Sequence, residues 1–384
     1  MKKKLNFKEK ILRFTKKSKK WTHKYVWIVT IACICLMLAL TWMDRRSIVS
    51  AVSEKDDNVI TATMVGDIMF GRHVENIVNR SGYEFLFRHV NQYFRNSDYV
   101  TGNFEHPILD NPEQYTKQDK KIHLYTKEDS LSALKNQNFS VLNLANNHQM
   151  DYSSEGVLAT LKAFQGQNLA MVGAGEHEEG AKLIDYQTIK GNVIATLGFT
   201  DSYVDGSRAT INTPGVLAAK PEIFIPLINE AKKNADLVIV NVHWGQEYET
   251  SASPRQKALA KAISHAGADI IVGSHPHVLQ SIDRYNNTII FYSLGNFIFD
   301  QGWSSTRESA IVQYKLDANG IANFEITPLL IKEATPTPLK SNDFYHKKKI
   351  FKRLTKESPD TINFTEKDGK LTFSVDYNEM LEKQ

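Results

Sequence analysis

The sequence predicts an α/β protein in which a largely buried sheet is flanked by helices, preceded by a single membrane-spanning helix. Runs of β-branched residues alternate with segments whose apolar residues recur at helical spacing. Several of these runs end in short motifs of Asp, Asn and His. Ligand sites in such folds lie at the carboxyl ends of the strands. We therefore expect the motifs to meet at one rim of the sheet.

The N-terminal segment is strongly basic and then apolar. Residues 1–46 carry 13 Lys/Arg and 2 Asp/Glu, a net charge of +11, which leaves −7 for the remainder of this +4 chain. Residues 25–43 form a 19-residue run without a charged side chain, and about 20 such residues span a bilayer as a helix. Trp27 and Trp42 lie near its ends, as interfacial aromatic residues do.

This pattern predicts a cytoplasmic arm over 1–24, a transmembrane anchor over 25–43 and an extracellular main part, because cytoplasmic flanks carry the excess of Lys and Arg. A cleaved signal peptide is the alternative. The length of the apolar run and the absence of a small-x-small cleavage site after it favour the uncleaved anchor.

The composition excludes several kinds of site. The only two cysteines, Cys33 and Cys35, lie in the apolar run, so the outer part has neither a disulfide nor a thiolate metal site. The chain contains no G-x-x-x-x-G-K-[ST] loop for ATP. Its acidic main part and its location argue against nucleic-acid binding.

A short polar linker over 44–58 precedes the domain that we expect over 59–335. Strands are expected over 59–66, 139–145, 169–175, 193–200, 236–245, 268–277 and 287–299. Helices are expected over 130–137, 153–165, 223–234 and 254–267. Residues 309–331 are typical of a hairpin with Asn319-Gly320 in its turn. A tail over 336–384 holds a basic amphipathic stretch, 346–356, and a second hairpin around Asp368-Gly369.

Carboxylate, amide and imidazole groups recur in six motifs, and together they are the ligands of a divalent metal ion. The motifs are Gly66-Asp67, Asn103-Phe104-Glu105, Asn146-Asn147-His148, His243-Trp244-Gly245, Ser274-His275-Pro276-His277 and Leu294-Gly295-Asn296. The paired histidines are the most specific, because two imidazoles directly after a buried strand rarely serve packing. Taken singly, Asp67 and the asparagines could be turn residues, and His243 could be a packed core histidine.

In this order the motifs resemble the calcineurin-like metallophosphoesterase superfamily, and more closely its branch of CapA/PgsA capsule biosynthesis proteins. The stretches that carry the resemblance are GDIMFGR, GNFEHP, LANNHQMDY, HWGQEY, IIVGSHPHV and FYSLGNFIFDQGW. The resemblance implies layered sheets flanked by helices and a centre of one or two divalent ions, with Mn, Fe or Zn expected.

The resemblance also implies roles for individual residues. Asp67 and His277 would hold a first ion, Glu105 would bridge, and Asn147, His243 and His275 would hold a second. His148 would protonate a leaving group or steady the transition state. Asn103, Asn146, Asp151 and Asn296 would support these ligands, with turn capping as the alternative for Asp151 and Asn296. Arg72 is a candidate for binding an anionic substrate group, and a surface ion pair is its alternative.

Two positions depart from the superfamily pattern. Met69 stands where a histidine ligand is expected, and the bridging position is Glu105 rather than an aspartate. The first ion would therefore lack one ligand. One tight and one labile ion, or a single ion, are both compatible with this set.

The resemblance implies a subunit of a poly-γ-glutamate synthase complex, with an ATP-using cytoplasmic partner and another membrane subunit. It would be either a metal-dependent hydrolase or transferase, or a non-catalytic scaffold or export subunit with a structural metal site. A glycan capsule polymer stays open as an alternative substrate. Contact with an anionic polymer should be local, at the metal site, at Arg72 or at the basic stretch, whose alternative is a solvated helix face. The cations of that stretch are Lys347, Lys348, Lys349, Lys352 and Arg353.

Overall fold

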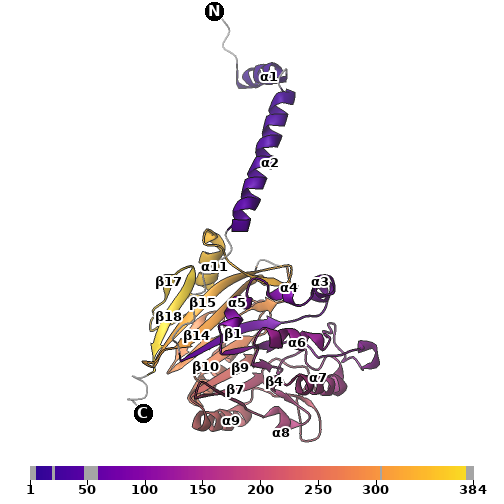
Figure 1. Ribbon diagram of the computed structural model, residues 1–384, viewed down its shortest axis with the longest axis vertical. Helices are drawn as coiled ribbons and strands as arrows, with labels where there is room; N and C mark the ends of the chain where they lie inside the picture. Colours follow the sequence, from indigo (N-terminus) through magenta and orange to yellow (C-terminus); the bar gives the residue numbers. More distant parts are fainter. Residues whose placement is uncertain (1–5, 20–21, 47–58, 303–304, 378–384) are drawn as a thin grey trace, which may run out of the picture. The chain divides into compact units, whose positions relative to one another are not determined.

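The computed structural model describes residues 6–19, 22–46, 59–302 and 305–377 (Figure 1). The chain divides into two compact units, Met1–Ala51 and Val52–Gln384, and each is considered by itself. Residues 47–58 of the predicted linker lie outside the described residues, and its first three residues end a helix.

The N-terminal unit consists of two helices, α1 (Phe7–Ser18) and α2 (Thr22–Arg46). A capping box starts α1: the Asn6 side chain accepts from the Glu9 N–H, and the Glu9 carboxylate accepts from the Asn6 N–H. Within α2, the 18 residues Thr22–Ala39 are apolar enough and long enough to cross a membrane. The apolar helix predicted over 25–43 is therefore present, inside a longer helix.

The larger unit contains a ten-stranded mixed sheet. β1 lies in its middle, parallel to β2 on one side and antiparallel to β14 on the other. The strand order is β17 (Thr365–Lys367), β18 (Lys370–Asp376), β15 (Ile321–Lys332), β14 (Glu308–Leu316), β1 (Ile60–Ile68), β2 (Tyr99–Phe104), β3 (Val141–Asn143) and β4 (Ala170–Val172), while β13 (Asn296–Ile298) pairs with β1 and β16 (Thr335–Pro338) with β15.

A six-stranded sheet forms the second layer, and four of its neighbouring strands run parallel. Its order is β11 (Ile282–Tyr285), β12 (Thr288–Phe291), β10 (Ile270–Ser274), β9 (Leu237–His243), β7 (Asn192–Thr200) and β6 (Asp185–Ile189). A two-stranded sheet joins β5 (Ala174–Gly175) to β8 (Gly215–Val216).

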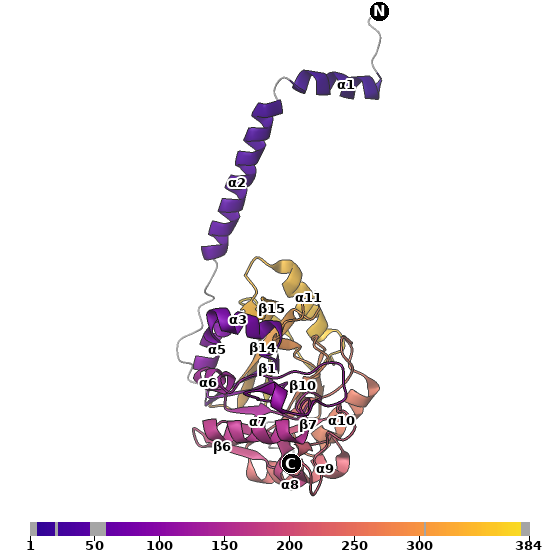
Figure 2. The same cartoon turned by 90° about the vertical axis from the view of Figure 1, so that its right-hand side faces the viewer.

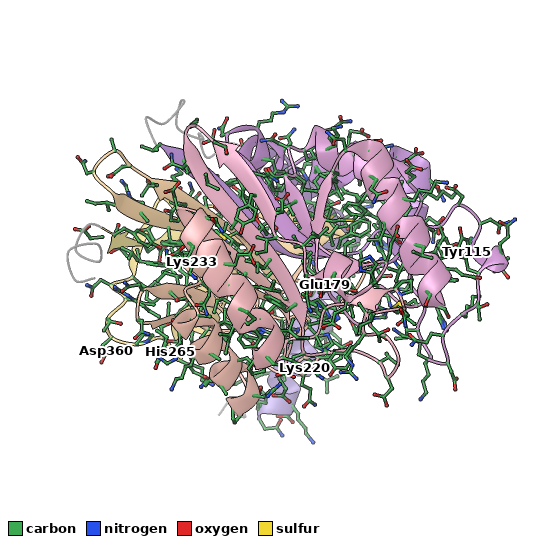
Figure 3. The ribbon with its side chains drawn as sticks, turned by 90° about the horizontal axis from the view of Figure 1, so that it is seen from below. Tyr115, Glu179, Lys220, Lys233, His265 and Asp360 are labelled. Atoms are coloured by element: carbon green, nitrogen blue, oxygen red, sulfur yellow. The ribbon has the colours of Figure 1, made fainter. Side chains whose placement is uncertain are left out.

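Most of the helices cover the outer faces of the two sheets (Figures 1 and 2). The elements are α3 (His73–Ser81), α4 (Glu84–Phe87), α5 (Asn91–Arg95), the 3-10 helix Pro112–Gln114, α6 (Asp129–Asn136), α7 (Ser153–Gln167), α8 (Glu178–Ala181), α9 (Pro221–Asn234), α10 (Pro254–His265) and α11 (Phe344–Thr355). α10 begins as the sequence predicts: Ser253 and Gln256 form a capping box around Pro254. Figure 3 shows the face formed by α9 and α10, where Lys220 and Lys233 mark the ends of α9.

Three apolar clusters hold the layers together. One lies between the sheets and combines residues such as Met64 of β1 with Ile239 of β9. A second packs α3 to α7 onto the outer face of the ten-stranded sheet, and a third packs α9 and α10 onto the six-stranded sheet. The predicted α/β class with layered, helix-flanked sheets is therefore confirmed.

Two predicted strands are each divided in the structure. Residues 287–299 were expected as one strand, but β12 belongs to the six-stranded sheet and β13 to the ten-stranded sheet. Gly295 has a φ of 67° directly before β13 and turns the chain between them. Residues 169–175 likewise form two short strands, β4 and β5, around Gly173.

The C-terminal residues 336–376 extend the ten-stranded sheet. The hairpin predicted over 309–331 is present as β14 and β15. The second predicted hairpin is β17–β18, with Asp368 and Gly369 in the left-handed region, and β18 pairs with β15. The predicted boundary between 335 and 336 falls inside β16.

Candidate metal centre

The ends of strands from both sheets meet at one rim and carry the polar motifs. Asp67 at the end of β1 is in register with Asn103 of β2 and with Asn296 of β13. His243 ends β9 opposite Ser274, the last residue of β10, so that His275 follows at the same level. These side chains are buried.

One group of ligand atoms is formed by Asp67, Glu105 and His243, which lie within 4.8 Å of one another. Asn103 holds the two carboxylates in place, since its Nδ2 donates to Asp67 Oδ1 (2.8 Å) and to Glu105 Oε2 (3.4 Å). Asn143 in turn donates to Asn103 Oδ1 (3.0 Å). Asn103 is thus in contact with two candidate ligands.

A second group is formed by His275, His277 and Glu247, again within 4.8 Å. Glu247 was not among the predicted residues. Its only sequence signal is its place four residues after His243, in the stretch HWGQEY. The groups adjoin: His277 Nδ1 is 3.2 Å from Asp67 Oδ2, and His277 Nε2 is 3.7 Å from Glu105 Oε1.

The chemistry of these side chains fits a divalent cation. Glu105 Oε1 and His275 Nδ1 are buried and have no hydrogen-bond partner among the described residues, although a buried polar atom left unpaired is costly. Burial and the neighbouring Asp67 carboxylate raise the pKa of Glu105 well above its usual value. A cation between the carboxylates would remove this repulsion.

Burial keeps the histidines neutral, which is the form that binds metal. Burial, with the neighbouring His275 and His277, lowers the pKa of His243 well below its usual value. Burial and His277 lower the pKa of His275 to about 3. His275 and His277 also have positive φ angles of 93° and 56°. Such strained backbone concentrates at functional sites.

Several asparagine and serine residues orient the histidines. Asn147 Oδ1 is 2.9 Å from His243 Nε2, so this predicted ligand lies at the centre. Asn296 Oδ1 lies 2.9 Å from His277 Nδ1, and Asn296 Nδ2 donates to Thr306 O (3.1 Å). A proton on Nδ1 directed at Asn296 leaves the His277 Nε2 lone pair for a metal ion.

Two serines and Asn146 complete the surroundings. Ser274 Oγ lies 3.1 Å from His243 Nδ1, and Ser202 Oγ lies 3.0 Å from His275 Nε2. Asn146 donates to Phe104 O (2.8 Å) and accepts from the His148 N–H (3.1 Å), which fixes the loop that carries His148. Ser202, in the loop after β7, carried no motif in the sequence.

His148 is held by an acid that is itself paired with a lysine. His148 Nδ1 is 2.8 Å from Asp151 Oδ2. Lys120 Nζ donates to Asp151 Oδ1 (2.5 Å) and to Asn147 O (2.9 Å). Burial lowers the pKa of His148 and Lys120 adds to this, while Asp151 acts in the opposite direction. Lys120 lies in a loop without a recognisable motif, and the sequence did not single it out.

Arg72 forms an ion pair with Asp300 and lies over the ring of Phe299, 5.4 Å from its centroid. This is the ion-pair alternative for Arg72, and it leaves the guanidinium engaged at the edge of the centre. Phe299 also contacts His277, with ring centroids 4.8 Å apart. Asp300 was not among the predicted residues.

His106 and Met69 both lie in the interior. His106 is fully buried, and its Nε2 accepts from the Phe70 N–H (2.8 Å). Burial lowers the pKa of His106 to about 3. Met69 is also fully buried. Both side chains pack behind the centre.

The basic stretch is helix α11, and only part of it is solvated: Lys348 and Lys352 are exposed, whereas the other three cations form ion pairs. Lys349 and Arg353 both pair with the buried Glu308, at 2.6 and 3.0 Å. Lys347 is largely buried and pairs with Glu366 at 3.2 Å. The apolar side of α11 packs into the cluster between the sheets. Three of the five predicted polymer-binding cations therefore serve the fold.

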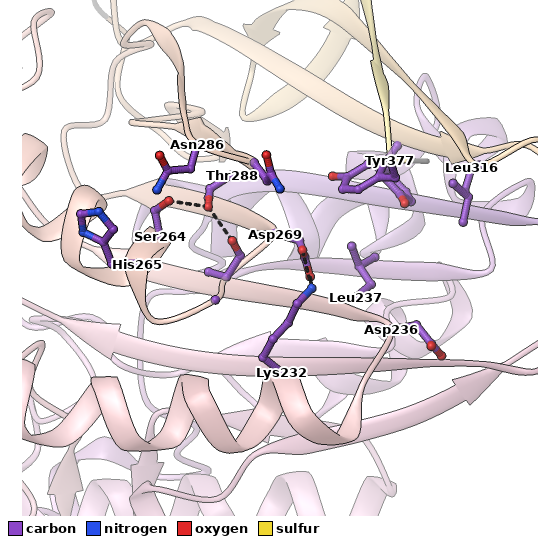
Figure 4. A pocket seen from close by; sticks show the side chains of 15 residues that line it. Lys232, Asp236, Leu237, Ser264, His265, Asp269, Asn286, Thr288, Leu316 and Tyr377 are labelled. Carbon is purple, nitrogen blue, oxygen red and sulfur yellow. Dashed lines mark hydrogen bonds and ion pairs between the residues drawn. The ribbon is translucent and has the colours of Figure 1, made fainter. Parts of the chain in front are cut away.

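The cavities of the larger unit include two that differ in their position relative to the centre. One, of about 610 Å³, is lined in part by Phe299 and Asp300 and so begins beside the metal centre. The other, of about 470 Å³, contains none of the predicted site residues. In it, Lys232 donates to Asp269 and Thr288 donates to Ser264 (Figure 4). That second cavity lies near the amino ends of β9 and β12, whereas the candidate ligands follow carboxyl ends.

Comparison with known proteins identifies close relatives. The profile of the family described as "Bacterial capsule synthesis protein PGA_cap" matches residues 61–301. The chain is 49% identical over 388 residues to the capsule biosynthesis protein CapA of Bacillus anthracis, covering 100% of this chain and 94% of that protein. It is 51% identical over 387 residues to the PGA biosynthesis protein CapA of Bacillus subtilis, covering 100% of both.

Solved structures give more distant matches. A 5′-nucleotidase precursor from Thermus thermophilus superposes with a TM-score of 0.41 at 12% identity, covering 77% of this chain and 58% of that one. The NAD nucleotidase of Haemophilus influenzae gives a TM-score of 0.39 at 12% identity, covering 84% of this chain and 66% of that one.

Proposed function

Because the chain belongs to the bacterial capsule synthesis protein PGA_cap family, we propose that it is a membrane-anchored subunit of the machinery that makes and exports poly-γ-glutamate. Its helix α2 would be the anchor, with residues 1–24 in the cytoplasm and the larger unit outside the cell. An ATP-using cytoplasmic subunit and another membrane subunit would be its partners.

We further propose that the rim holds one or two divalent ions, with Mn, Fe or Zn as candidates. The observation that carries this proposal is the set of buried atoms without hydrogen-bond partners, Glu105 Oε1 and His275 Nδ1, within a group of neutral histidines and carboxylates. The predicted ligands are Asp67, Glu105, Asn147, His243, His275 and His277. Glu247 would add a carboxylate next to His277, a candidate ligand of the first ion, which has Met69 in place of a histidine ligand.

A divalent ion at this position would lower the pKa of a bound water and offset charge on an oxyanion. The chain's own residues would handle the proton. His148 would carry a proton at Nε2 for a leaving group, while Asp151 fixes the ring through Nδ1 and Lys120 holds Asp151. This arrangement supports a metal-dependent hydrolase or transferase. It argues against a purely structural subunit, which would not require a strained backbone at His275 and His277.

The test is elemental analysis of the full-length protein, purified in detergent, beside a His275→Ala/His277→Ala variant. We expect the native protein to bind one or two equivalents after incubation with Mn, Fe or Zn, and the variant to lose them. A His265→Ala/His346→Ala variant, whose histidines lie outside the centre, is the control and should keep its metal. A native protein that stays metal-free in all three incubations would rule out the metal centre.

A further inference from the structure

We propose that the cavity of about 610 Å³ beside the metal centre is a carboxylate-binding subsite for a γ-glutamyl chain. The identity of this polymer rests on the proposed function, whereas the subsite is argued from the cavity itself. Arg88, Arg307 and Lys332 all line it. We call these three residues the cavity cations.

The cavity and the metal centre share a wall residue, Phe299. Phe299 packs its ring against His277, and Phe299 and Asp300 belong to the cavity wall. A chain bound in the cavity would therefore have its next residues at the candidate ligands. Arg72, held by Asp300, lies at this junction.

The cavity cations have no ion-pair partner in the described part of the chain. Other cations near the centre do: Arg72 pairs with Asp300, and Lys120 with Asp151. None of the ion pairs between described residues involves Arg88, Arg307 or Lys332. The three cavity cations outnumber the two carboxylates of the lining, Asp300 and Glu333, and Asp300 is already paired with Arg72, so an anion that enters the cavity would meet excess positive charge.

Two of the cavity cations are held by bonds that leave N–H groups free. Arg307 Nε donates to Ile331 O (2.8 Å). Arg88 Nη1 donates to Thr335 Oγ1 (3.1 Å), and its guanidinium lies 3.5 Å from the centroid of the Phe85 ring. A guanidinium that is already oriented loses less conformational entropy when it binds a carboxylate in a fork.

Two of the cavity cations, Arg88 and Lys332, act on one neighbouring side chain. His89, a half-buried residue next to Arg88, has a pKa lowered first by burial and then by the charges of Arg88 and Lys332. Both charges therefore act on the same ring. An anion bound between them would interact with both.

Acceptors between the cations favour a polyamide over a compact polyphosphate. Glu333 lines the same cavity, and with Asp300 it places negative charge among the cations. Such acceptors would repel a densely charged phosphate chain, yet they can accept from amide N–H groups. A γ-glutamyl chain has a carboxylate and an amide N–H in every residue, so it satisfies both kinds of group.

The test is binding of a fluorescent γ-linked glutamate decamer to the full-length protein in detergent micelles. In an Arg88→Gln/Arg307→Gln/Lys332→Gln variant we expect affinity to fall about tenfold or more, and in Lys332→Gln, an exposed position that should not disturb folding, several-fold. A Lys162→Gln variant removes an exposed cation on α7 and should bind like the native protein. A decamer of γ-linked isoglutamine, in which each α-carboxylate is replaced by a carboxamide, should not bind measurably.

Two outcomes would overturn the subsite. One is that the Lys332→Gln protein and the triple variant both bind the decamer as tightly as the native protein does. The other is that the uncharged decamer binds as tightly as the charged one. Metal content separates this result from the proposed function. The three substitutions should leave metal content unchanged, and the His275→Ala/His277→Ala protein should still bind the decamer through the cavity. If the native protein binds metal but not the decamer, the proposed metal centre stands and the proposed subsite is wrong.

Discussion

Asn296 is a residue that contacts a candidate ligand, not the ion itself. It fixes His277 through Nδ1 and is itself held by its bond to Thr306 O. For Asn296→Ala we expect metal affinity to fall about 10- to 100-fold, because His277 loses its orientation. Metal titration of the full-length protein measures this. Asn234→Ala, at the exposed end of α9, is the matched control, and equal affinities of the two variants would contradict the assigned role.

Gly273 in β10 lies directly before the Ser274-His275 motif and allows two backbones to approach closely. A Cβ at this position would lie 2.0 Å from Tyr292 O and 2.6 Å from Trp244 Nε1. Gly273→Ala should therefore lower the free energy of unfolding by about 3 kcal/mol, as overpacking does. Gly166→Ala on α7 meets only the end of Glu128, at 3.9 Å, and should stabilise the helix by up to about 1 kcal/mol. Denaturant unfolding compares the two, and a Gly273→Ala protein as stable as Gly166→Ala would contradict the geometry.

The candidate ligands could be predicted where a motif follows a strand, as with His275 and His277. Glu247, Lys120 and Asp300 could not, because each lies in a loop whose path depends on the completed fold. Paired residues raise a different difficulty. The sequence places Arg72 near the motif of Asp67, but only the fold brings Asp300 against it.

At the scale of elements, β15 carries a charge cluster that makes stability depend on pH. Glu325 accepts from Lys315 of β14 (2.8 Å) and from Lys370 of β18. Burial raises the pKa of Glu325, but the two lysines outweigh it, and the net pKa is lowered. A lowered folded pKa means that the ionised form stabilises the fold above the unfolded pKa, about 4.3, and that this stability is lost as pH falls through the folded pKa.

We therefore expect Glu325→Gln to cost about 1 kcal/mol of unfolding free energy at pH 7 and much less at about pH 2.5, as the pH falls through the lowered folded pKa. Urea unfolding of native and variant proteins at the two pH values measures the difference. Glu230→Gln, on the exposed side of α9, should change little at either pH. A cost for Glu325→Gln that is the same at about pH 2.5 and at pH 7 would show that the lysine pairs do not carry it.

Helices with clear caps were the most predictable elements. The segment 254–267 contains Ser253, Pro254 and Gln256, and the structure has α10 there. The C-terminal residues were less predictable, because β18 pairs with β15 far back in the chain and only that pairing places the segment in the sheet. For the same reason the sequence alone suggested that the charged side chains of α11 are exposed. In the structure, two of them, Lys349 and Arg353, form ion pairs with Glu308 of β14.

At the scale of the whole molecule, the proposed orientation can be tested through the cysteines. Cys33 and Cys35 are the only cysteines, so a Cys33→Ser/Cys35→Ser background has none. Added to this background, Lys162→Cys on α7 should react with a membrane-impermeant maleimide in intact cells, and Lys8→Cys on α1 should react only after lysis. Both positions are exposed in the structure. Labelling of the Lys8→Cys protein in intact cells would show that the orientation is the opposite of the proposed one.

The position of β1 also determines when the protein can fold during synthesis. β1 is the first strand of the larger unit to leave the ribosome, yet its Ile60 pairs with Leu316 of β14. β14 pairs in turn with β15, and β15 pairs with β18, which ends at Asp376. A nascent chain therefore holds β1 with one edge open until nearly all of the polypeptide has emerged, and open strand edges recruit other chains. Folding of the larger unit should accordingly follow translation, and truncations before residue 376 should accumulate as aggregates or chaperone-bound intermediates.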